Sequence, residues 1–293
     1  MKLNRMPWRQ IAAVTVLAGT AIAFTYYFMT HPEVGELLGK IPSATLGLLL
    51  LLYVATIGVL VLIFTATLRL CRLKIESSEI ALLTAYSSVI NFFGPLQSGP
   101  AFRAVYLFKK YKLNLKSYAM ATLVYYFFFG FFSSMFLVSG LIGWWTLVLT
   151  VVAAVVSYGL IRSRWIVPRL RNLDMRGWYY LASATLLQVC LMGLIYYIEL
   201  QAVNPGIGVG QAIVYTGAAN LALFVSFTPG AIGFREAFLL FSQQLHDISP
   251  SVIIATNILD RALYITVMLL LAVFIFGTQA NKRFKSSSKK AVG

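Results

Sequence analysis

The sequence is poor in charge, and above all in acidic charge. Asp and Glu together number 9 in a chain of 293 residues, and charged residues make up 11% of it against 59% hydrophobic residues. Apolar runs recur from end to end, so no stretch is long and polar enough to form a separate soluble domain of ~100 residues. We therefore expect an all-α integral membrane protein, folded as a single transmembrane domain over residues 1–293.

Residues typical of several kinds of functional site are also scarce. Cys71 and Cys190 lie far apart, in or beside apolar segments, and His31 and His246 are isolated in predicted loops. This pattern predicts no disulfide, no metal site and no bound cofactor. Because no nucleotide-binding sequence of the GxxxxGK[ST] type occurs, we expect no direct ATP hydrolysis.

The apolar segments fall into two kinds. The first kind is long enough to cross a bilayer as a helix and predicts six spans, at residues 10–29, 44–68, 117–141, 146–161, 178–200 and 252–277. The segment 10–29 follows a basic start, but it is too long for a cleavable signal and should remain as a first helix. The second kind, at residues 79–108 and 210–245, is interrupted by proline and glycine and predicts two broken segments.

The breaks share a spacing. Pro95 and Gly99 in the first segment match Pro229 and Gly233 in the second, where Gly230 also follows the proline. Proline removes an amide donor from a helix and glycine tolerates the turn that follows. These residues therefore predict where each segment breaks.

The basic residues indicate how the broken segments run. Of the 24 lysines and arginines, 21 fall in five clusters, at residues 2–9, 69–74, 103–116, 162–176 and 282–290. If both broken segments are re-entrant, returning to the side they came from, all five clusters share one face, as the positive-inside rule requires of a cytoplasmic face. We therefore predict that both termini and the basic tail 280–293 are cytoplasmic. The net charge of +15 is then explained by contact with anionic lipid and needs no nucleic acid.

This topology predicts an inverted repeat. The first re-entrant segment comes from the cytoplasm and the second from outside, within a first half of about 44–141 and a second half of about 178–277. Gly- and Pro-interrupted segments at corresponding positions of two halves are typical of transporters that bind substrate between the halves.

Two motifs resemble a known family. The run TPGAIGFREA, with DRALY about 25 residues later, resembles the Pro-Gly-x-x-Gly-x-Arg-Glu-Ala signature of the lysylphosphatidylglycerol synthase transmembrane-region family, also called the flippase-like domain family. The run PLQSGPAFR is similar to that family's earlier motif. It differs at Gln97 and Pro100, where the family often has a basic and an acidic residue, which weakens a charge-based role for the first motif.

The resemblance implies a function in lipid handling in the cytoplasmic membrane of a bacterium or archaeon. The chain would translocate or handle a phospholipid or a lipid-linked substrate. Larger members carry a soluble aminoacyl-transferase domain that these 293 residues do not include, so we expect the chain not to be a lipid synthase by itself. Two alternatives stay open: an integral-membrane transferase acting on a lipid-linked group, and a scaffold that recruits a separate lipid-modifying enzyme.

Four charged residues inside apolar surroundings are the candidate centre. They are Arg235, Glu236, Asp260 and Arg261. Charges at the bilayer centre are costly and need partners, so we expect these four to lie close together. They could be salt bridges that only hold the fold, or their arginines could receive a lipid phosphate, for which a planar bidentate donor is suited.

Weaker candidates surround this centre. Arg103 could bind substrate or extend to the interface and touch lipid headgroups without selectivity. The aromatic run that starts at Tyr125 is expected to be a packing or lipid-facing surface. A transferase would need a deep catalytic carboxylate, and only Glu236 and Asp260 are predicted to be deep enough.

Overall fold

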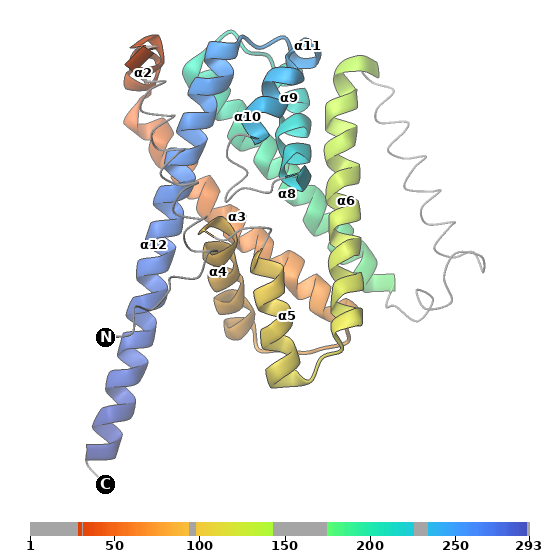
Figure 1. The fold of residues 1–293 in the computed structure, drawn as a ribbon, viewed down its shortest axis with the longest axis vertical. Coiled ribbons are helices and arrows are strands. Elements are labelled where there is room, and N and C mark those ends of the chain that lie inside the picture. The colour runs from red at the N-terminus through yellow and green to blue at the C-terminus, as the bar shows by residue number, and fades with distance from the viewer. Residues whose placement is uncertain (1–28, 31, 94–97, 143–174, 226–233, 292–293) are drawn as a thin grey trace, which may run out of the picture.

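The computed structural model is a bundle of helices (Figure 1). It describes residues 29–30, 32–93, 98–142, 175–225 and 234–291, and these hold helices but no strand. Their elements, with the labels of Figure 1, are α2 (Pro32–Gly39), α3 (Ser43–Leu70), α4 (Ser77–Phe93), α5 (Ser98–Tyr111), α6 (Leu115–Ile142), α8 (Met175–Val203), α9 (Val209–Ala222), η2 (Leu223–Val225), α10 (Phe234–Phe241), α11 (Gln243–His246) and α12 (Pro250–Ala291).

Within the described residues, four helices are long and apolar enough to cross a membrane. They contain the stretches Ser43–Leu70, Leu115–Gly140, Arg176–Val203 and Pro250–Ile275. These correspond to four of the six predicted spans, which confirms a multi-pass, all-helical membrane protein. The other two predicted spans, residues 10–29 and 146–161, lie outside the described residues except for Met29. Helix α12 continues to Ala291 and so contains most of the predicted basic tail, residues 280–293.

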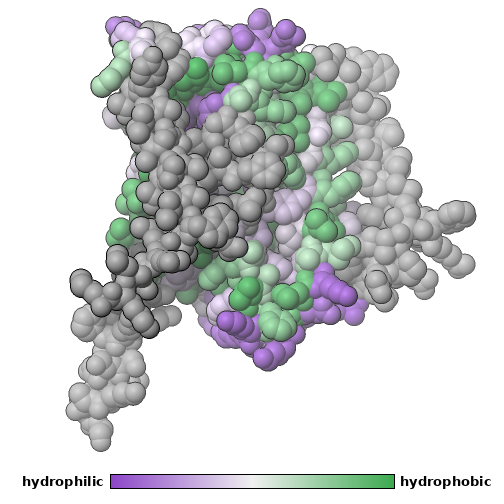
Figure 2. Space-filling model, viewed as in Figure 1, coloured by the Kyte–Doolittle hydropathy of each residue, from purple (hydrophilic) through white to green (hydrophobic). Residues whose placement is uncertain are grey.

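The surface has the polarity of a membrane protein. Figure 2 shows hydrophilic residues at the lower and upper edges of the described surface and mostly hydrophobic residues between them. Large apolar side chains face outward on the long helices, among them Leu51 on α3, Leu123 on α6 and Leu270 on α12. A bilayer solvates such side chains, so their exposure costs nothing there.

The first broken segment folds as an antiparallel hairpin of α4 and α5. At its inner end, Ser98 Oγ donates a hydrogen bond to the Ile90 carbonyl at 2.9 Å. At its outer end, the Tyr106 and Tyr111 hydroxyls and Lys110 Nζ each donate a 2.8 Å hydrogen bond to Glu79. The two outer ends of the segment therefore lie side by side at the lower edge of the bundle in Figure 1.

The second broken segment also doubles back, from the opposite end of the bundle. Gln211 Nε2, near the start of α9, donates to the Asp247 carbonyl at 3.1 Å, just after α11 ends. The Tyr215 ring lies 5.7 Å from the His246 ring, centroid to centroid. The outer ends of this hairpin lie at the upper edge in Figure 1, so the two hairpins reach toward each other from opposite edges. His246 was expected in a loop, but it lies in α11 and is buried. Its Nε2 lies 3.2 Å from the Leu239 carbonyl oxygen, within hydrogen-bond distance, which allows the ring to be buried.

Two basic clusters, at residues 69–74 and 103–116, lie wholly within the described residues, and Arg176 of a third cluster lies at the start of α8. Arg69, at the end of α3, lies over the Tyr180 ring at the start of α8, 4.6 Å from its centroid. Leu107 of α5, Leu68 of α3 and Tyr118 of α6 share one buried cluster. The basic residues that follow α3 and α5, and those that begin α8, are thereby gathered at one edge of the bundle.

Gly217 sets the approach of α9 to α6. A Cβ at this position would lie 2.2 Å from the backbone nitrogen of Leu137 and 2.7 Å from the Ser133 carbonyl oxygen. Both atoms belong to helix backbone, which cannot move aside as a flexible side chain can. Small residues allow membrane helices to pack backbone to backbone in this way, without help from a hydrophobic effect.

We expect Gly217→Val to separate α6 from α9 and to destabilise the detergent-solubilised protein by about 1–3 kcal/mol, the usual cost of overpacking. Thermal unfolding of the purified variant measures it. Gly58→Ala is the matched control, since nothing lies within 4 Å of a Cβ at that position of α3. A Gly217→Val protein as stable as Gly58→Ala would contradict the close approach.

A second prediction concerns Glu79. Burial works to raise the pKa of this carboxyl, but hydrogen bonds from Lys110, Tyr111 and Tyr106 outweigh it, so the pKa lies below its ordinary value. The stabilisation is therefore present above the ordinary glutamate pKa of ~4.3 and is lost as the pH falls through the lowered pKa. We expect Glu79→Gln to lower the thermal midpoint at neutral pH and the gap to wild type to close in acid. A gap that stays constant with pH would contradict the prediction.

Candidate functional site

A cavity of about 240 Å³ lies where the two hairpins meet the long helices. The residues that line it come from every described element from α3 to α12 except α11. A pocket built by segments so far apart in sequence forms only in the complete fold. Its wall is rich in aromatic and polar side chains, with three arginines among them, Arg103, Arg235 and Arg261.

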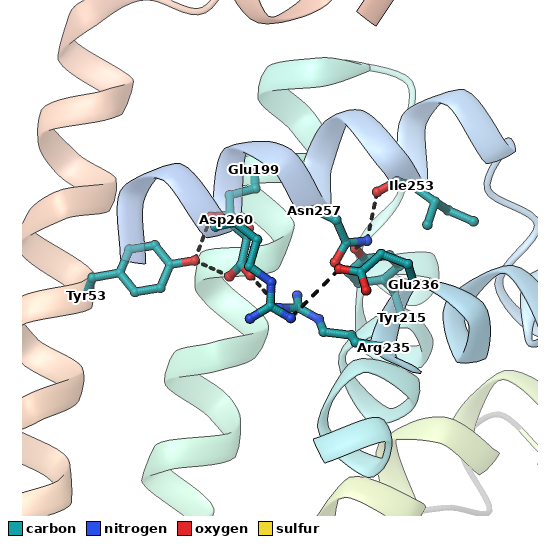
Figure 3. Close-up of polar contacts among 9 residues, drawn as sticks. Tyr53, Glu199, Tyr215, Arg235, Glu236, Ile253, Asn257 and Asp260 are labelled. Carbon is teal, nitrogen blue, oxygen red and sulfur yellow. Dashed lines mark hydrogen bonds and ion pairs between the residues drawn. The ribbon is translucent and has the colours of Figure 1, made fainter. Parts of the chain in front are cut away.

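The deepest charged contact joins α10 to α12. Arg235 Nη1 donates a hydrogen bond to Asp260 Oδ2, and both side chains are almost fully buried. The Arg235 guanidinium also lies over the Tyr196 ring of α8, 4.9 Å from its centroid. Figure 3 shows Arg235 reaching from its helix toward Asp260. The local reason is that Arg235 falls in the first turn of α10, at the end of that helix that lies toward the centre of the bundle.

A second ion pair lies beside the first but is looser. Arg261 Nη2 lies 3.8 Å from Glu236 Oε1, beyond hydrogen-bond distance. Among the described residues, Arg261 Nε and Nη2 have no hydrogen-bond partner. All four charged residues that the sequence singled out are thus brought together in two pairs. The pair of Arg235 and Asp260 is hydrogen-bonded, whereas in the pair of Arg261 and Glu236 the arginine keeps donors that are unpaired in the described part of the chain.

Arg103 lies on the opposite wall, on α5 of the first hairpin. Its guanidinium carbon is 4.8 Å from the centroid of the Phe64 ring, and the side chain is half-buried. Its Nε has no hydrogen-bond partner within the part of the chain that the structure describes. Arg103 therefore faces the cavity, and this position differs from the interfacial one considered from sequence.

Neutral polar groups complete the wall. The Tyr125 hydroxyl donates to Gln188 Oε1 at 3.1 Å, and both residues line the cavity. Asn220 also lines it, is fully buried, and has no hydrogen-bond partner for either side-chain atom among the described residues. The aromatic run that begins at Tyr125 thus divides: Tyr125, Tyr126 and Phe129 face the cavity, whereas Phe127 is exposed on the outer surface.

The predicted helix breaks are only partly described. Pro95, Pro229, Gly230 and Gly233 lie outside the described residues. Gly99 lies in the first turn of α5, where its N–H donates to Asn91 Oδ1 at 3.3 Å. A Cβ there would lie 2.5 Å from the Ser87 carbonyl oxygen, so glycine allows α5 to return close along α4.

Sequence reasoning missed one charged member of the site. Glu199 of α8 is fully buried, and its Oε1 lies 2.8 Å from the Tyr53 hydroxyl of α3. That hydroxyl is also hydrogen-bonded to Asp260 Oδ1 (Figure 3). The expectation that only Glu236 and Asp260 are deep was therefore wrong. The available signal was that Glu199 is the sole charged residue between Trp178 and Leu200, at the end of the predicted span 178–200.

No metal centre is built from these acids. The described residues contain no group of three or more His, Cys, Asp and Glu side chains arranged to hold a metal ion. The arginines beside the carboxylates give the site planar donors that suit an anion.

The comparisons agree with the fold and with the two motifs. The family model described as "Lysylphosphatidylglycerol synthase TM region" matches residues 10–272, which is most of the chain and includes the whole cavity. No curated protein matches the sequence. The chain is a multi-pass membrane protein related to lipid handling, and it belongs to the lysylphosphatidylglycerol synthase transmembrane-region family.

Proposed function

We propose that the protein translocates a phospholipid or lipid-linked substrate across the cytoplasmic membrane, and that the central cavity holds the phosphate of its headgroup. The observation that carries this proposal is a pair of arginines, Arg103 and Arg261, that line one cavity with donors left free among the described residues. A buried charged donor without a partner is costly, and a phosphate offers the acceptors it lacks.

The arrangement of the hairpins supports movement of the headgroup in preference to mere binding. Arg103 belongs to the hairpin from the lower edge, whereas Arg235 is held by the hairpin from the upper edge (Figure 1). In this proposal both hairpins are re-entrant and form an inverted repeat, so that each offers one cation to the headgroup from its own side of the bilayer. Broken helices that meet at the midplane of two inverted halves suit alternating access.

The orientation follows from the charges at the lower edge. We propose that the edge with the basic residues around α3, α5 and α8 is cytoplasmic, where anionic lipid attracts them, and that both termini lie on that side. The membrane is the cytoplasmic membrane of a bacterium or archaeon.

The carboxylates in and beside the cavity support transport over catalysis. Asp260 is occupied by Arg235 and Tyr53, and Glu236 is paired with Arg261. A general base must reach the substrate proton. Asp260 and Glu236 are engaged with cations, and Glu199 does not line the cavity. We therefore propose no enzymatic activity for the chain itself; a separate lipid-modifying enzyme could supply or receive the lipid.

The test is lipid movement between leaflets of liposomes that contain the purified protein, with fluorescent phospholipids of several headgroups. We expect Arg261→Gln and Arg103→Gln each to slow it by at least about tenfold, since a hydrogen bond to a charged group is worth ~1.5–3 kcal/mol. Lys109→Gln is the matched control, because Lys109 is an exposed base on the same helix as Arg103 and does not line the cavity. Chemical change of the lipid would favour a transferase, and no movement and no change would favour a scaffold.

A charge exchange distinguishes a structural pair from a substrate site. If Arg261 and Glu236 interact, Glu236→Arg with Arg261→Glu should be more stable than the sum of the single changes predicts, by about 0.5–3 kcal/mol. We expect the double variant to regain stability but not lipid movement, because the cavity then presents a carboxylate where the phosphate binds. Recovery of both stability and movement would show that the pair only holds the fold.

A further inference from the structure

Glu199 has no counter-ion in the described part of the bundle. The ion pairs there join Arg235 to Asp260, Arg261 to Glu236 and Lys110 to Glu79, and none includes Glu199. Its side chain is fully buried, and its Oε2 has no hydrogen-bond partner among the described residues. An ionised carboxylate in such surroundings is far more costly than a neutral carboxylic acid, so the site favours the protonated form.

Hydrogen-bond counting leads to the same conclusion. The Tyr53 hydroxyl lies within hydrogen-bond distance of both Glu199 Oε1 and Asp260 Oδ1, yet it carries a single proton. Both contacts are hydrogen bonds only if one of the two carboxyl groups supplies a second proton. Asp260 accepts a hydrogen bond from the cationic Arg235 guanidinium, whereas Glu199 has no such donor within the described bundle, so the second proton is assigned to Glu199.

The charged and titratable groups around Glu199 fit this assignment. Those that act on it or on its partners are Tyr53 from α3, Tyr196 from its own helix, Tyr215 from α9, Arg235 from α10 and Asp260 from α12. The central cluster of Arg235, Arg261, Glu236, Asp260 and Glu199 has two positive and three negative side chains when all are ionised. One bound proton makes it neutral.

We propose that Glu199 is a proton-binding site and that Tyr53 connects it to Asp260 at the cavity wall. Glu199 passes its proton to the Tyr53 oxygen while Tyr53 passes its own proton to Asp260 Oδ1. Glu199 becomes the carboxylate, Asp260 becomes the acid, and Tyr53 is unchanged, so no proton is gained or lost. A neutral Asp260 no longer pairs with Arg235, and the guanidinium is then available to an anion.

This transfer links proton movement to the lipid, a step that rests on the proposed function. A phosphate headgroup binds to Arg235 when the proton has moved to Asp260. Asp260 lines the cavity, so it can then release the proton to water. The Asp260 carboxylate re-forms its ion pair with Arg235 and thereby displaces the headgroup. When the cavity opens to the other side of the membrane, Asp260 takes up a proton there, and Tyr53 relays it to Glu199 before the next cycle. One proton is released for each headgroup delivered, which would let a proton gradient drive the movement.

Infrared spectroscopy of the purified protein tests the proton site without any transport assay. We expect wild type at neutral pH to show the carbonyl-stretch band of a protonated carboxylic acid, and Glu199→Gln to lose it. Glu236→Gln is the matched control, with the same chemical change at a carboxylate that already has a cation, and it should keep the band. Absence of the band from wild type, or its persistence in Glu199→Gln, would overturn the proposal.

Coupling is tested in liposomes with the membrane potential clamped to zero and a gradient of one pH unit. We expect the final distribution of labelled lipid between the leaflets of wild type to shift by up to about tenfold, the limit for one proton per lipid. Glu199→Gln should shift by less than about twofold on the same scale. An equal shift in both proteins would overturn the coupling. If wild type moves no lipid at all, the proposed function fails, and the infrared result still decides the proton site.

Discussion

The contact between Arg235 and Asp260 organises the centre of this protein. It joins α10, the short returning helix of the second hairpin, to the last membrane helix, in a place where both side chains are almost fully buried. A buried pair of this kind adds little net stability, because desolvation cancels much of the attraction, but losing one partner is severe. The pair therefore acts chiefly as a constraint: α10 and α12 must adopt the one arrangement that keeps both charges satisfied.

The rest of the site follows from that constraint. Once Asp260 is fixed, Tyr53 of α3 and Glu199 of α8 meet it through a single hydroxyl, and Tyr196 packs its ring against Arg235. Arg261, next along α12, is left with a loose partner and spare donors facing the cavity. This combination suits a binding site. The tight pair of Arg235 and Asp260 fixes the shape of the site, and the unpaired donors of Arg261 can bind a ligand.

The two hairpins solve a problem that the bilayer imposes. Backbone groups in a broken helix cannot be left unpaired in hydrocarbon, so irregular segments must be enclosed by protein. Here α4 and α5 are joined by hydrogen bonds that involve Ser98, Asn91 and Glu79. Helix α9 packs directly against the backbone of α6 at Gly217. Enclosure by the long helices lets the hairpins bring polar side chains to the middle of the bundle, where Arg103 and Asn220 line the cavity.

The sequence by itself determined that the protein is embedded in lipid, where its four described spans lie and where two segments are interrupted. It also determined that Arg235, Glu236, Asp260 and Arg261 come together. Long apolar runs and isolated ionisable residues leave few alternatives in a membrane, because each charge must find a partner. Only the tertiary structure decided that Arg103 faces the cavity, that Tyr125 and Phe127 of one run face opposite ways, and that Glu199 meets Tyr53 and Asp260. These outcomes depend on how α3, α8 and α12 rotate about their axes, and in uniformly apolar helices no amphipathic pattern fixes that rotation, so packing alone sets it.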